Sequence, residues 1–356
     1  MKIIELFSGI GGFSKGFEDA GYTIEEHYYS EIDKHAIANY KYNYPNAKYI
    51  GSVVDIRQGD FRGIDIITFG SPCQDFSLAG KRKGLEGERS SLIEYAIRMV
   101  TDIRPSLFIW ENVKGAFSSN AGADFWAILQ AFANIGGYRL EWQLLNTKWF
   151  LPQNRERIYL IGHLADRSEP GVFPIGENDA RIDERTIETR SIRTLTAGGN
   201  SGGLHSSMTL IVEERLNTSQ DGQGFREIKD GSGQPVIKIK SKNRRLNETI
   251  EKHNLKEGDD LCFIDSYNKT INKTETSTIS TRVDASSSSH LFDGYSIRRL
   301  TEIECERLQG FPDNWTEYGN YDGVIKKIPK TQRYKMLGNA VTVKVVEEIA
   351  KRINLE

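Results

Sequence analysis

The first half of the chain alternates short apolar runs with amphipathic segments. Six runs have the length and flanking turn residues of strands, at residues 2–7, 23–30, 64–69, 106–111, 138–146 and 157–162. Four segments between them carry apolar residues at helical spacing, at residues 13–20, 34–42, 91–102 and 123–134. Such alternation is typical of βαβ units, which build a parallel sheet. The pattern therefore predicts an α/β domain over residues 1–164.

The pattern changes after residue 164. Turn residues and short β-like stretches replace the regular alternation, and they predict a smaller second domain with long loops over residues 165–330. A charged helix is expected at residues 301–309, and a last helix at 340–353 has an apolar face that needs a cover. We therefore expect the C-terminal segment 331–356 to return to the first domain and complete it.

Composition narrows the class of protein. The 356 residues are enough for one large and one smaller domain, and 38% hydrophobic with 27% charged residues is typical of a soluble globular protein. No apolar run is long enough for a membrane helix, and the first seven residues indicate a strand rather than a signal peptide, so we expect a cytoplasmic protein. The net charge of −2 means that a polyanionic partner must be bound by local basic patches.

The three cysteines lie far apart without the spacing of metal ligands, which argues against a disulfide framework and a zinc site. We expect no metal. Cys262 and Cys305 are expected to be inert core residues. Cys73 differs, because it follows the apolar run 64–69 and a glycine and a proline shape its approach. It would lie just outside the carboxyl end of a parallel strand, where open α/β sheets bind ligands.

A glycine-rich turn, Phe7-Ser8-Gly9-Ile10-Gly11-Gly12, joins the first predicted strand to the first helix. Taken alone, it is equally well explained as a plain tight turn. Glu31 ends the next predicted strand, where a carboxylate can accept hydrogen bonds from two ribose hydroxyls. Asp55, beside Ile56, offers an acceptor for an adenine amino group next to an apolar wall. Together these features favour an adenosine-type ligand, and the incomplete G-x-G-x-x-G order does not specifically indicate NAD.

Several sequence blocks resemble, in the same order, the motifs of the DNA cytosine-5 methyltransferases. Besides the turn at 7–12, they are Gly70-Ser71-Pro72-Cys73-Gln74 with Phe76-Ser77, Glu111-Asn112-Val113, Gln153-Asn154-Arg155-Glu156-Arg157, Arg307-Leu308-Gln309-Gly310-Phe311-Pro312 and Gly338-Asn339-Ala340-Val341. The resemblance covers residues 3–164 and 296 to the C-terminus, and six blocks in one order are very specific. The middle region does not match, as expected for the segment that reads the DNA sequence in this family.

The resemblance implies a Rossmann-like S-adenosylmethionine-dependent methyltransferase fold, a mostly parallel sheet with helices on both faces, plus a smaller, irregular β-rich target-recognition domain. It implies S-adenosylmethionine as the methyl donor and S-adenosylhomocysteine as the product. The residues expected to bind the cofactor are Phe7, Ser8, Gly9, Gly11, Gly12, Glu31, Ile32, Asp55, Ile56, Pro72, Leu92, Asn339 and Val341.

The chemistry of cytosine agrees with this resemblance. C5 is a poor nucleophile, but attack of a thiolate on C6 gives an enamine whose C5 can accept a methyl group, and the resemblance assigns this attack to Cys73. Positive charge favours a thiolate, and Arg155 and Arg157 alternate on the strand of their motif. Glu111, at a strand end, would hydrogen-bond or protonate N3, although a capping or solvated acid is the plain alternative. The target base is stacked in a duplex, so it must be swung out.

Expected DNA contacts come from loops and basic runs. Residues 80–89 combine four basic residues with three glycines, which indicates either a solvated loop or a lid over the flipped base. The basic run 238–245 is either a solvated face or a phosphate contact. Thr194-Leu195 and Thr278-Ile279 are alternative candidates for the short recognition element of the family. The expected DNA-binding residues are Gln74, Ser77, Lys81, Arg82, Lys83, Arg89, Gln153, Thr194, Lys240, Lys242, Arg244, Arg245, Thr278 and Arg282.

The sequence thus predicts a DNA cytosine-5 methyltransferase of bacterial or phage type that acts on a specific double-stranded DNA sequence. We expect a monomer that is nucleoid-associated in a bacterial cell, and the sequence leaves open whether a cognate restriction endonuclease accompanies it. One alternative is a tRNA-methylating relative, which the long middle region disfavours. A non-catalytic DNA-binding regulator is disfavoured by Cys73, Glu111 and Arg157, and an NAD-linked oxidoreductase would rest on the glycine turn alone.

Overall fold

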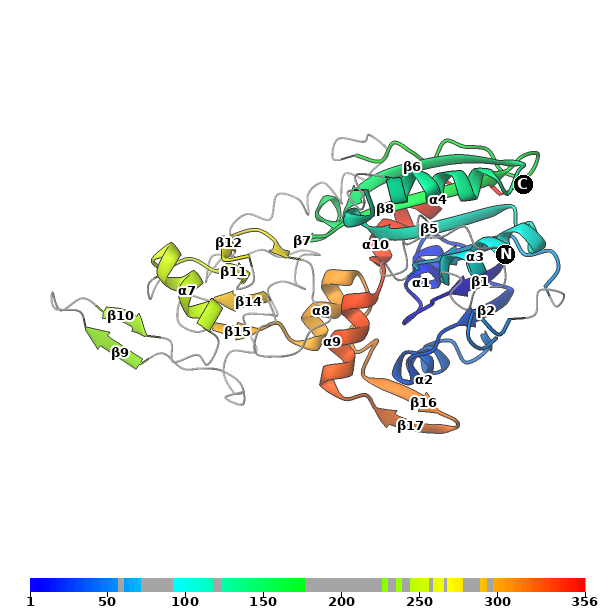
Figure 1. The fold of residues 1–356 in the computed structure, drawn as a ribbon. Coiled ribbons are helices and arrows are strands. Elements are labelled where there is room, and N and C mark those ends of the chain that lie inside the picture. Colours follow the sequence, from blue (N-terminus) through cyan, green and yellow to red (C-terminus); the bar gives the residue numbers. More distant parts are fainter. Residues whose placement is uncertain are drawn as a thin grey trace, which may run out of the picture.

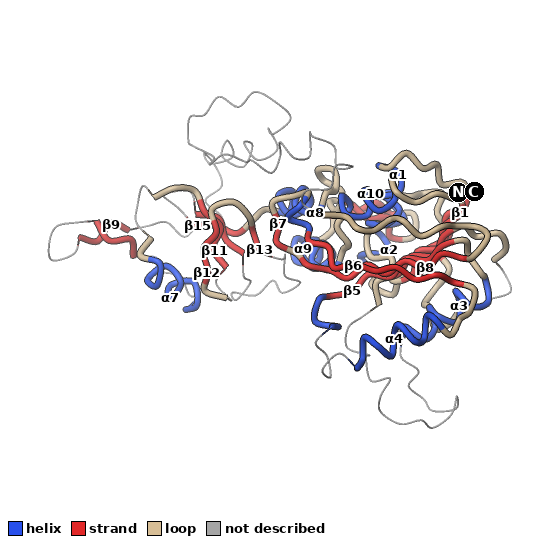
Figure 2. Tube along the Cα trace, turned by 90° about the horizontal axis from the view of Figure 1, so that it is seen from above, coloured by secondary structure: helices blue, strands red, loops and turns tan. Residues whose placement is uncertain are grey.

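The computed structural model describes residues 1–56, 61–71, 92–117, 123–176, 226–229, 235–238, 244–255, 259–265, 268–277, 289–292 and 297–355. Figure 1 shows a large sheet at one end of the molecule and shorter strands at the other, with helices between them. The N- and C-termini lie close together beside the large sheet in both Figure 1 and Figure 2.

A seven-stranded sheet forms the centre of the larger region. Its strands are β1 (Lys2–Leu6), β2 (Glu26–Ser30), β3 (Lys48–Tyr49), β4 (Ile66–Phe69), β5 (Leu107–Val113), β6 (Tyr138–Asn146) and β8 (Glu156–Leu164), in the order β3-β2-β1-β4-β5-β8-β6. The strands from β3 to β5 are parallel, whereas β8 runs antiparallel to both β5 and β6. The mostly parallel sheet predicted from the sequence is confirmed.

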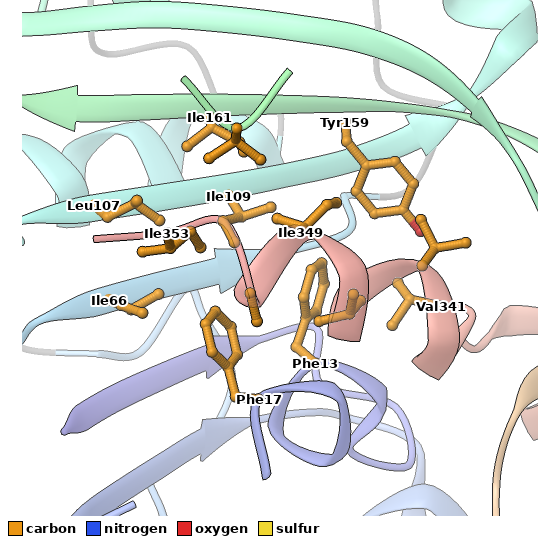
Figure 3. Packing of buried hydrophobic residues seen from close by; sticks show 14 of the residues in the cluster. Phe13, Phe17, Ile66, Leu107, Ile109, Tyr159, Ile161, Val341, Ile349 and Ile353 are labelled. Atoms are coloured by element: carbon orange, nitrogen blue, oxygen red, sulfur yellow. The ribbon is translucent and has the colours of Figure 1, made fainter. Parts of the chain in front are cut away.

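Helices cover both faces of this sheet, as Figure 2 shows. One face packs against α1 (Gly12–Asp19) and α10 (Val343–Ala350), and the other packs against α3 (Leu92–Ile103) and α4 (Ala123–Ala133). Neighbouring strand residues point to opposite faces, so a strand covered on both faces is apolar at most positions. Ile3 therefore joins the α1/α10 cluster, which Figure 3 shows, while Ile4 joins the α3/α4 cluster.

Local signals explain where several helices begin and end. The helix α2 (Lys34–Asn43) starts at Asp33, whose carboxylate accepts hydrogen bonds from the backbone N–H groups of its first turn. The helix α3 ends at Ile103, before Pro105, as the clash of a proline ring with a preceding helical residue requires. The last helix begins at Val343 rather than at the predicted residue 340, because Ala340 is extended.

The smaller region has short strands. A four-stranded antiparallel sheet has the order β12-β11-β14-β15, and its strands are β11 (Cys262–Asp265), β12 (Thr270–Asn272), β14 (Ser289–Phe292) and β15 (Ile297–Arg299). One helix, α7 (Arg244–His253), packs on this sheet through Leu246 and Ile250. A separate hairpin is formed by β9 (Arg226–Lys229) and β10 (Pro235–Lys238). The prediction of an irregular, β-rich second region is confirmed.

A strand pair and two helices lie where the two regions meet. The two-residue strands β7 (Gln153–Asn154) and β13 (Thr276–Ser277) pair in parallel. The helices α8 (Glu302–Gln309) and α9 (Lys330–Asn339) lie between the regions in Figure 1, and the hairpin of β16 (Tyr318–Tyr321) and β17 (Val324–Lys327), which connects them, packs on α2. The 3₁₀ helices η4 (Lys114–Phe117) and η6 (Thr147–Trp149) follow β5 and β6.

Candidate active site

Four loops with polar or glycine residues meet at one edge of the large sheet. The glycine-rich turn follows β1, Glu31 follows β2, Gly70 follows β4, and Glu111 lies near the end of β5. These four strands are neighbours in the order β2-β1-β4-β5 and all are parallel. Their carboxyl ends therefore share one edge, which is where ligands bind in open α/β sheets.

The glycines of the first turn have different surroundings. Gly9 has a φ of +54°, its N–H donates to Glu31 Oε2 at 2.8 Å, and a Cβ added there would meet nothing within 4 Å. A Cβ at Gly11 would instead lie 2.7 Å from the Tyr44 ring, and one at Gly12 would lie 2.6 Å from the Val341 side chain. Only Gly9 leaves room for a ligand, whereas Gly11 and Gly12 permit close packing of the protein on itself.

The residues beside this turn fit an adenosine-type ligand. The Ser8 hydroxyl is buried and has no hydrogen-bond partner among the described residues. Glu31 Oε1 accepts hydrogen bonds from the N–H groups of Ile32 at 2.7 Å and Asp33 at 3.0 Å, so its carboxylate is fixed at the mouth of the turn. The Ile32 side chain is 75% exposed, which is unusual for a large apolar residue. A fixed acceptor, a free hydroxyl and an apolar wall suit a ribose and an adenine.

A buried acid beneath the turn belongs to no predicted site. Glu5, on β1, accepts hydrogen bonds from the backbone N–H groups of Phe13 and Ser14 at the start of α1, and from the Tyr40 hydroxyl at 2.9 Å. Burial raises the pKa of Glu5 to about 7, although these hydrogen bonds act against the shift. The His27 ring lies within 2.9 Å of the Ser14 hydroxyl. An acid within the apolar run of the first strand is the sequence signal for this cluster.

Glu111 and Arg157 form the charged pair at the end of β5. Arg157 Nε lies 3.2 Å from Glu111 Oε1, without the geometry of a hydrogen bond, and this buried oxygen accepts none from the described residues. Burial raises the pKa of Glu111, while the charges of Arg157 and Arg155 oppose the rise. A Cβ at Gly70 would lie 3.2 Å from Glu111 Oε2, so the glycine gives the carboxylate room. An oxygen that accepts no hydrogen bond among the described residues, together with the raised pKa, suits a carboxyl group that binds a ring nitrogen.

The chain just before Cys73 is held by two side chains of β5. Asn112 Nδ2 donates to the Ser71 carbonyl at 2.9 Å, and Trp110 Nε1 donates to the Ser71 hydroxyl at 3.0 Å. All three residues are buried. The sequence resemblance included Asn112 within a motif, but it did not indicate Trp110, whose indole bond depends on the pairing of β4 with β5.

The remaining predicted residues of the cofactor site differ in how far they are exposed to solvent. Asp55 is exposed, Ile56 is half-buried, and Phe7 has a φ of 52° at the end of β1. Leu92, the first residue of α3, packs against the cluster under that face. Asn339 is exposed at the end of α9, while Val341 is buried against Gly12.

Two predicted residues of the arginine motif are buried more deeply than their expected roles require. Arg155 is 3% exposed and donates to the backbone carbonyls of Gly338 and Ala340. Gln153 is fully buried and donates to the Leu308 carbonyl at 3.2 Å, which leaves it no surface for DNA in this structure. The motif predicted the residue types, but not these partners, which lie more than 150 residues away in sequence.

Many of the other predicted residues lie outside the described residues, as does the candidate lid at 80–89. They are Pro72, Cys73, Gln74, Ser77, Lys81, Arg82, Lys83, Arg89, Thr194, Lys240, Lys242, Thr278 and Arg282. Arg244 is the first residue of α7, and Arg245 follows it with an exposed side chain.

The part of the chain that the structure describes also bears on metals and membranes. Cys262 and Cys305 are buried free cysteines, as predicted, and burial raises the pKa of both thiols. Within the described ranges, no three histidine, cysteine or acidic side chains gather as metal ligands. In the same ranges, no helix has the length and apolar character needed to cross a membrane.

Comparison with known proteins identifies the family. Residues 1–355 match the family of C-5 cytosine-specific DNA methylases. The chain belongs to this family. It is 28% identical to the type II methyltransferase M.Bsp6I of Bacillus sp., over 99% of this chain and 98% of that protein. It is 30% identical to the type II methyltransferase M.NlaX of Neisseria lactamica, over 99% of this chain and 96% of that protein.

A solved structure supports the fold of this methylase. DNMT2 of Spodoptera frugiperda has 17% sequence identity and a TM-score of 0.56, and the match covers 98% of each chain. The predicted Rossmann-like methyltransferase fold is therefore confirmed. Family membership also confirms that the chain is a DNA cytosine-5 methyltransferase that uses S-adenosylmethionine, and this excludes the oxidoreductase considered from the glycine turn.

Proposed function

We propose that this enzyme methylates a cytosine swung out of a specific duplex sequence, through a covalent bond between Cys73 Sγ and C6 of the base. The observation that carries the proposal is the buried pair of Glu111 and Arg157 at a strand end, beside the anchored Ser71 that precedes Pro72 and Cys73. A buried carboxyl oxygen that accepts no hydrogen bond costs free energy, and a bound ligand that donates to it would remove this cost.

In the proposed reaction, the Cys73 thiolate bonds to C6 and the electron pair of the C5–C6 double bond moves into the ring as an enamine. Bound S-adenosylmethionine supplies an electrophilic methyl group, which C5 accepts. The proton on C5 then leaves to a base, the Sγ–C6 bond breaks, and the thiolate is restored together with the aromatic ring.

Glu111 stabilises the enamine through N3. Burial raises the pKa of this carboxyl group, which shifts it toward the protonated form, and that form can donate a hydrogen bond or a proton to N3 when the thiolate adds. The charge of Arg157, whose Nε lies 3.2 Å from the carboxyl group, opposes this rise in the pKa. The arginine also places positive charge near the developing negative charge of the ring.

The proposed cofactor site lies over the glycine turn. Glu31 would accept hydrogen bonds from the ribose hydroxyls, Ile32 would cover one face of the adenine, and the Ser8 hydroxyl would bind a polar group of the ligand. Asp55 would accept from the adenine amino group. The support is the open space at Gly9, the free Ser8 hydroxyl and the exposure of Ile32.

We propose that the larger region is the catalytic domain and that the β-rich region recognises the target. Val172 and Ile175 pack in the α1/α10 cluster, so we place the end of the catalytic domain after residue 176 rather than after the predicted residue 164. The chain re-enters this domain with α8 and α9 and ends with α10. DNA would bind between the two regions, with contacts from the loops predicted above and from Arg245 on α7.

The relatives indicate a biological setting. M.Bsp6I and M.NlaX are type II methyltransferases, and M.SPRI of Bacillus phage SPR, 26% identical over 99% of this chain, is an orphan methyltransferase. We propose that this enzyme protects DNA within a bacterial or phage modification system, with or without a cognate endonuclease. We further propose that it acts as a monomer at the nucleoid.

Bisulfite sequencing of DNA from cells that express the protein tests this function. We expect protected cytosines at one position of one short sequence, and none in cells that express the Cys73→Ser variant. Purified enzyme with labelled methyl donor should also label duplex DNA and leave tRNA transcripts unlabelled. Scattered or absent protection of DNA, together with labelled tRNA, would overturn the proposal in favour of the RNA substrate.

A further inference from the structure

Five buried polar side chains join the catalytic sheet to α8 and to the chain between α9 and α10. They are Thr147, Gln153, Arg155, Gln309 and Thr342, and we call them the buried seam. Each is at most 3% exposed. Buried polar groups are costly unless hydrogen-bonded, so their partners specify one arrangement of the backbone.

Arg155 holds the chain on both sides of Asn339. Its two terminal nitrogens donate to the carbonyls of Gly338 at 3.2 Å and Ala340 at 2.8 Å, and these residues flank Asn339. Burial, together with the charge of Arg157, lowers the pKa of Arg155 to about 9, which leaves the side chain protonated at neutral pH. Among the described residues, Arg155 forms no ion pair with a carboxylate, whereas Arg157 lies against Glu111.

Thr342 gives the same stretch of chain a further fixed point. Its hydroxyl donates to Gln309 Oε1 at 2.9 Å and lies 2.9 Å from the Thr147 hydroxyl. Gln309 Nε2 in turn donates to the Leu337 carbonyl at 2.8 Å. Residues 337–342 are therefore fixed from α8, from η6 and from the arginine motif at once.

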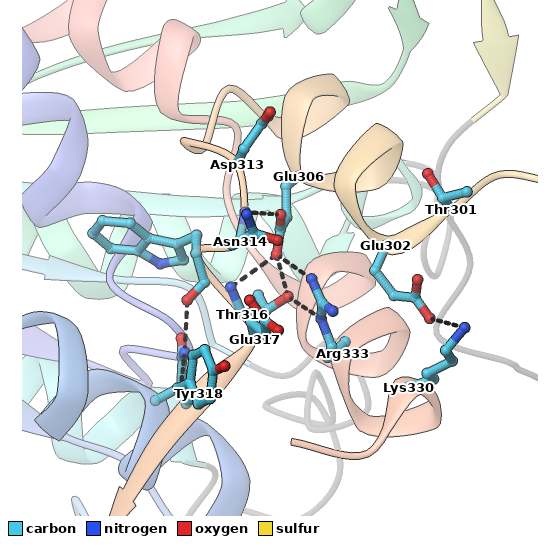
Figure 4. Close-up of polar contacts among 12 residues, drawn as sticks. Thr301, Glu302, Glu306, Asp313, Asn314, Thr316, Glu317, Tyr318, Lys330 and Arg333 are labelled. Carbon is cyan, nitrogen blue, oxygen red and sulfur yellow. Dashed lines mark hydrogen bonds and ion pairs between the residues drawn. The ribbon is translucent and has the colours of Figure 1, made fainter. Parts of the chain in front are cut away.

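A buried acid of α8 in turn fixes α8 against α9, as Figure 4 shows. Glu306 of α8 accepts from the N–H groups of Asn314 at 2.7 Å and Thr316 at 2.8 Å, and from Arg333 Nη2 of α9 at 2.9 Å. Arg333 Nε also donates to the Thr316 hydroxyl at 2.9 Å. Because α8 and α9 are joined in this way, they act on residues 338–342 as one unit.

The fixed chain rests directly on the glycine turn. A Cβ at Gly12 would lie 2.6 Å from Val341 Cγ2 and 3.0 Å from the Val341 carbonyl oxygen, so the two backbones are in close contact. A shift of residues 338–342 would therefore change the position of the turn or open a gap beside it.

We propose that Arg155 is a positioning residue for the cofactor, which holds residues 338–341 against the glycine turn, while Arg157 serves the base. This inference rests on the proposed cofactor site over that turn. It divides between two functions a pair of arginines that the sequence motif presents as equivalent.

The test compares Arg155→Lys with Arg157→Lys, two equal changes two residues apart. Lysine keeps the charge but cannot donate to two carbonyls in a fixed fork. Calorimetry with S-adenosylmethionine and no DNA should show a Kd about tenfold to a hundredfold higher for Arg155→Lys, and an unchanged Kd for Arg157→Lys. At saturating cofactor, kcat should fall mainly in Arg157→Lys. A normal Kd with a reduced kcat in Arg155→Lys would overturn the proposal.

A second variant protects the test against misfolding. Thr342→Val keeps the side-chain shape and removes the bonds to Gln309 and Thr147, so it should raise the Kd about threefold to tenfold while thermal unfolding remains cooperative. A Kd within twofold of the parent in this variant contradicts the proposal even if Arg155→Lys does not fold. These binding measurements do not involve Cys73, so a failure of the proposed covalent mechanism would appear separately.

Discussion

The faces of the large sheet and its carboxyl-end edge are held by different forces. The faces are covered by apolar side chains such as Phe17 and Ile349, whose burial is strong but does not depend on direction. The edge is held by buried polar groups such as Glu111, Arg155 and Thr342, whose hydrogen bonds and ion pairs require particular angles and distances. The faces therefore determine stability, and the edge determines where reacting groups lie.

The C-terminal segment contains both kinds of contact within a few residues. Residues 338–342 are fixed by the polar seam, and α10 directly after them packs on α1 and the sheet. This comparison predicts that substitutions at the edge change rates and affinities, while substitutions on the faces change the free energy of unfolding.

The largest effect is expected from Glu111→Gln. Loss of the proton donor to N3 should lower kcat by about 10² to 10⁴. The free energy of unfolding should change little, because the amide has the shape of the protonated carboxyl group and carries no charge for burial to penalise. Single-turnover methylation and urea unfolding check the two parts. A strongly destabilised variant with normal kcat would reverse the comparison at this position.

On the faces, Ile349→Ala should lower the free energy of unfolding by about 2–5 kcal/mol, because it leaves a cavity between α10 and the sheet. The Kd for S-adenosylmethionine of the folded enzyme should not change. Ile325→Ala is the matched control, because Ile325 is 50% exposed on β17 and its loss should cost less than about 0.5 kcal/mol. Urea unfolding measures both, and equal losses would contradict the comparison.

Glu5 gives a smaller, pH-dependent effect. Its pKa is about 7 in the folded chain against 4.5 for the free side chain, so the folded state keeps its proton when the unfolded state has lost it. The stability contributed by the protonated group is complete below pH 4.5 and is lost as pH rises through 7. Relative to Glu5→Gln, the parent should lose about 3 kcal/mol across this window.

The difference in stability between the parent and Glu5→Gln separates the titration of Glu5 from that of its neighbour His27. Burial lowers the pKa of His27 to about 4, which makes stability rise with pH over an overlapping range in both proteins. Urea unfolding of the two proteins at a series of pH values measures the difference. A difference that does not vary with pH would show that Glu5 is not protonated in the folded enzyme.

Local patterns predicted most of the sheet region. Strands such as β4 and β5 are buried on both faces, so they appear in the sequence as continuous apolar runs, and their helices follow at regular spacing. The start of α10 could not be predicted, because Ala340 has high helix propensity but is extended, and its carbonyl accepts a hydrogen bond from the distant Arg155. The reversed direction of β8 is likewise a property of pairing rather than of its own residues.

The sequence predicted which residue types form the site, but it did not predict which residues they contact. Glu31, Glu111 and the glycine turn follow strand ends, so spacing along the chain locates them. Whether Gly9 or Gly12 faces a ligand depends on Val341, which lies more than 300 residues away. The contact of Arg155 with Ala340 spans 185 residues of sequence, and no short motif encodes it.

A duplex that carries 5-fluorocytosine at the target position tests the central claim most directly. Fluorine on C5 cannot leave as a proton does, so the enzyme cannot release the base after methyl transfer. With S-adenosylmethionine present, the parent enzyme should form a DNA complex that survives denaturation, and the Cys73→Ser variant should form none. A parent enzyme that methylates ordinary DNA but is never trapped, or a Cys73→Ser variant that is trapped equally well, would contradict the account.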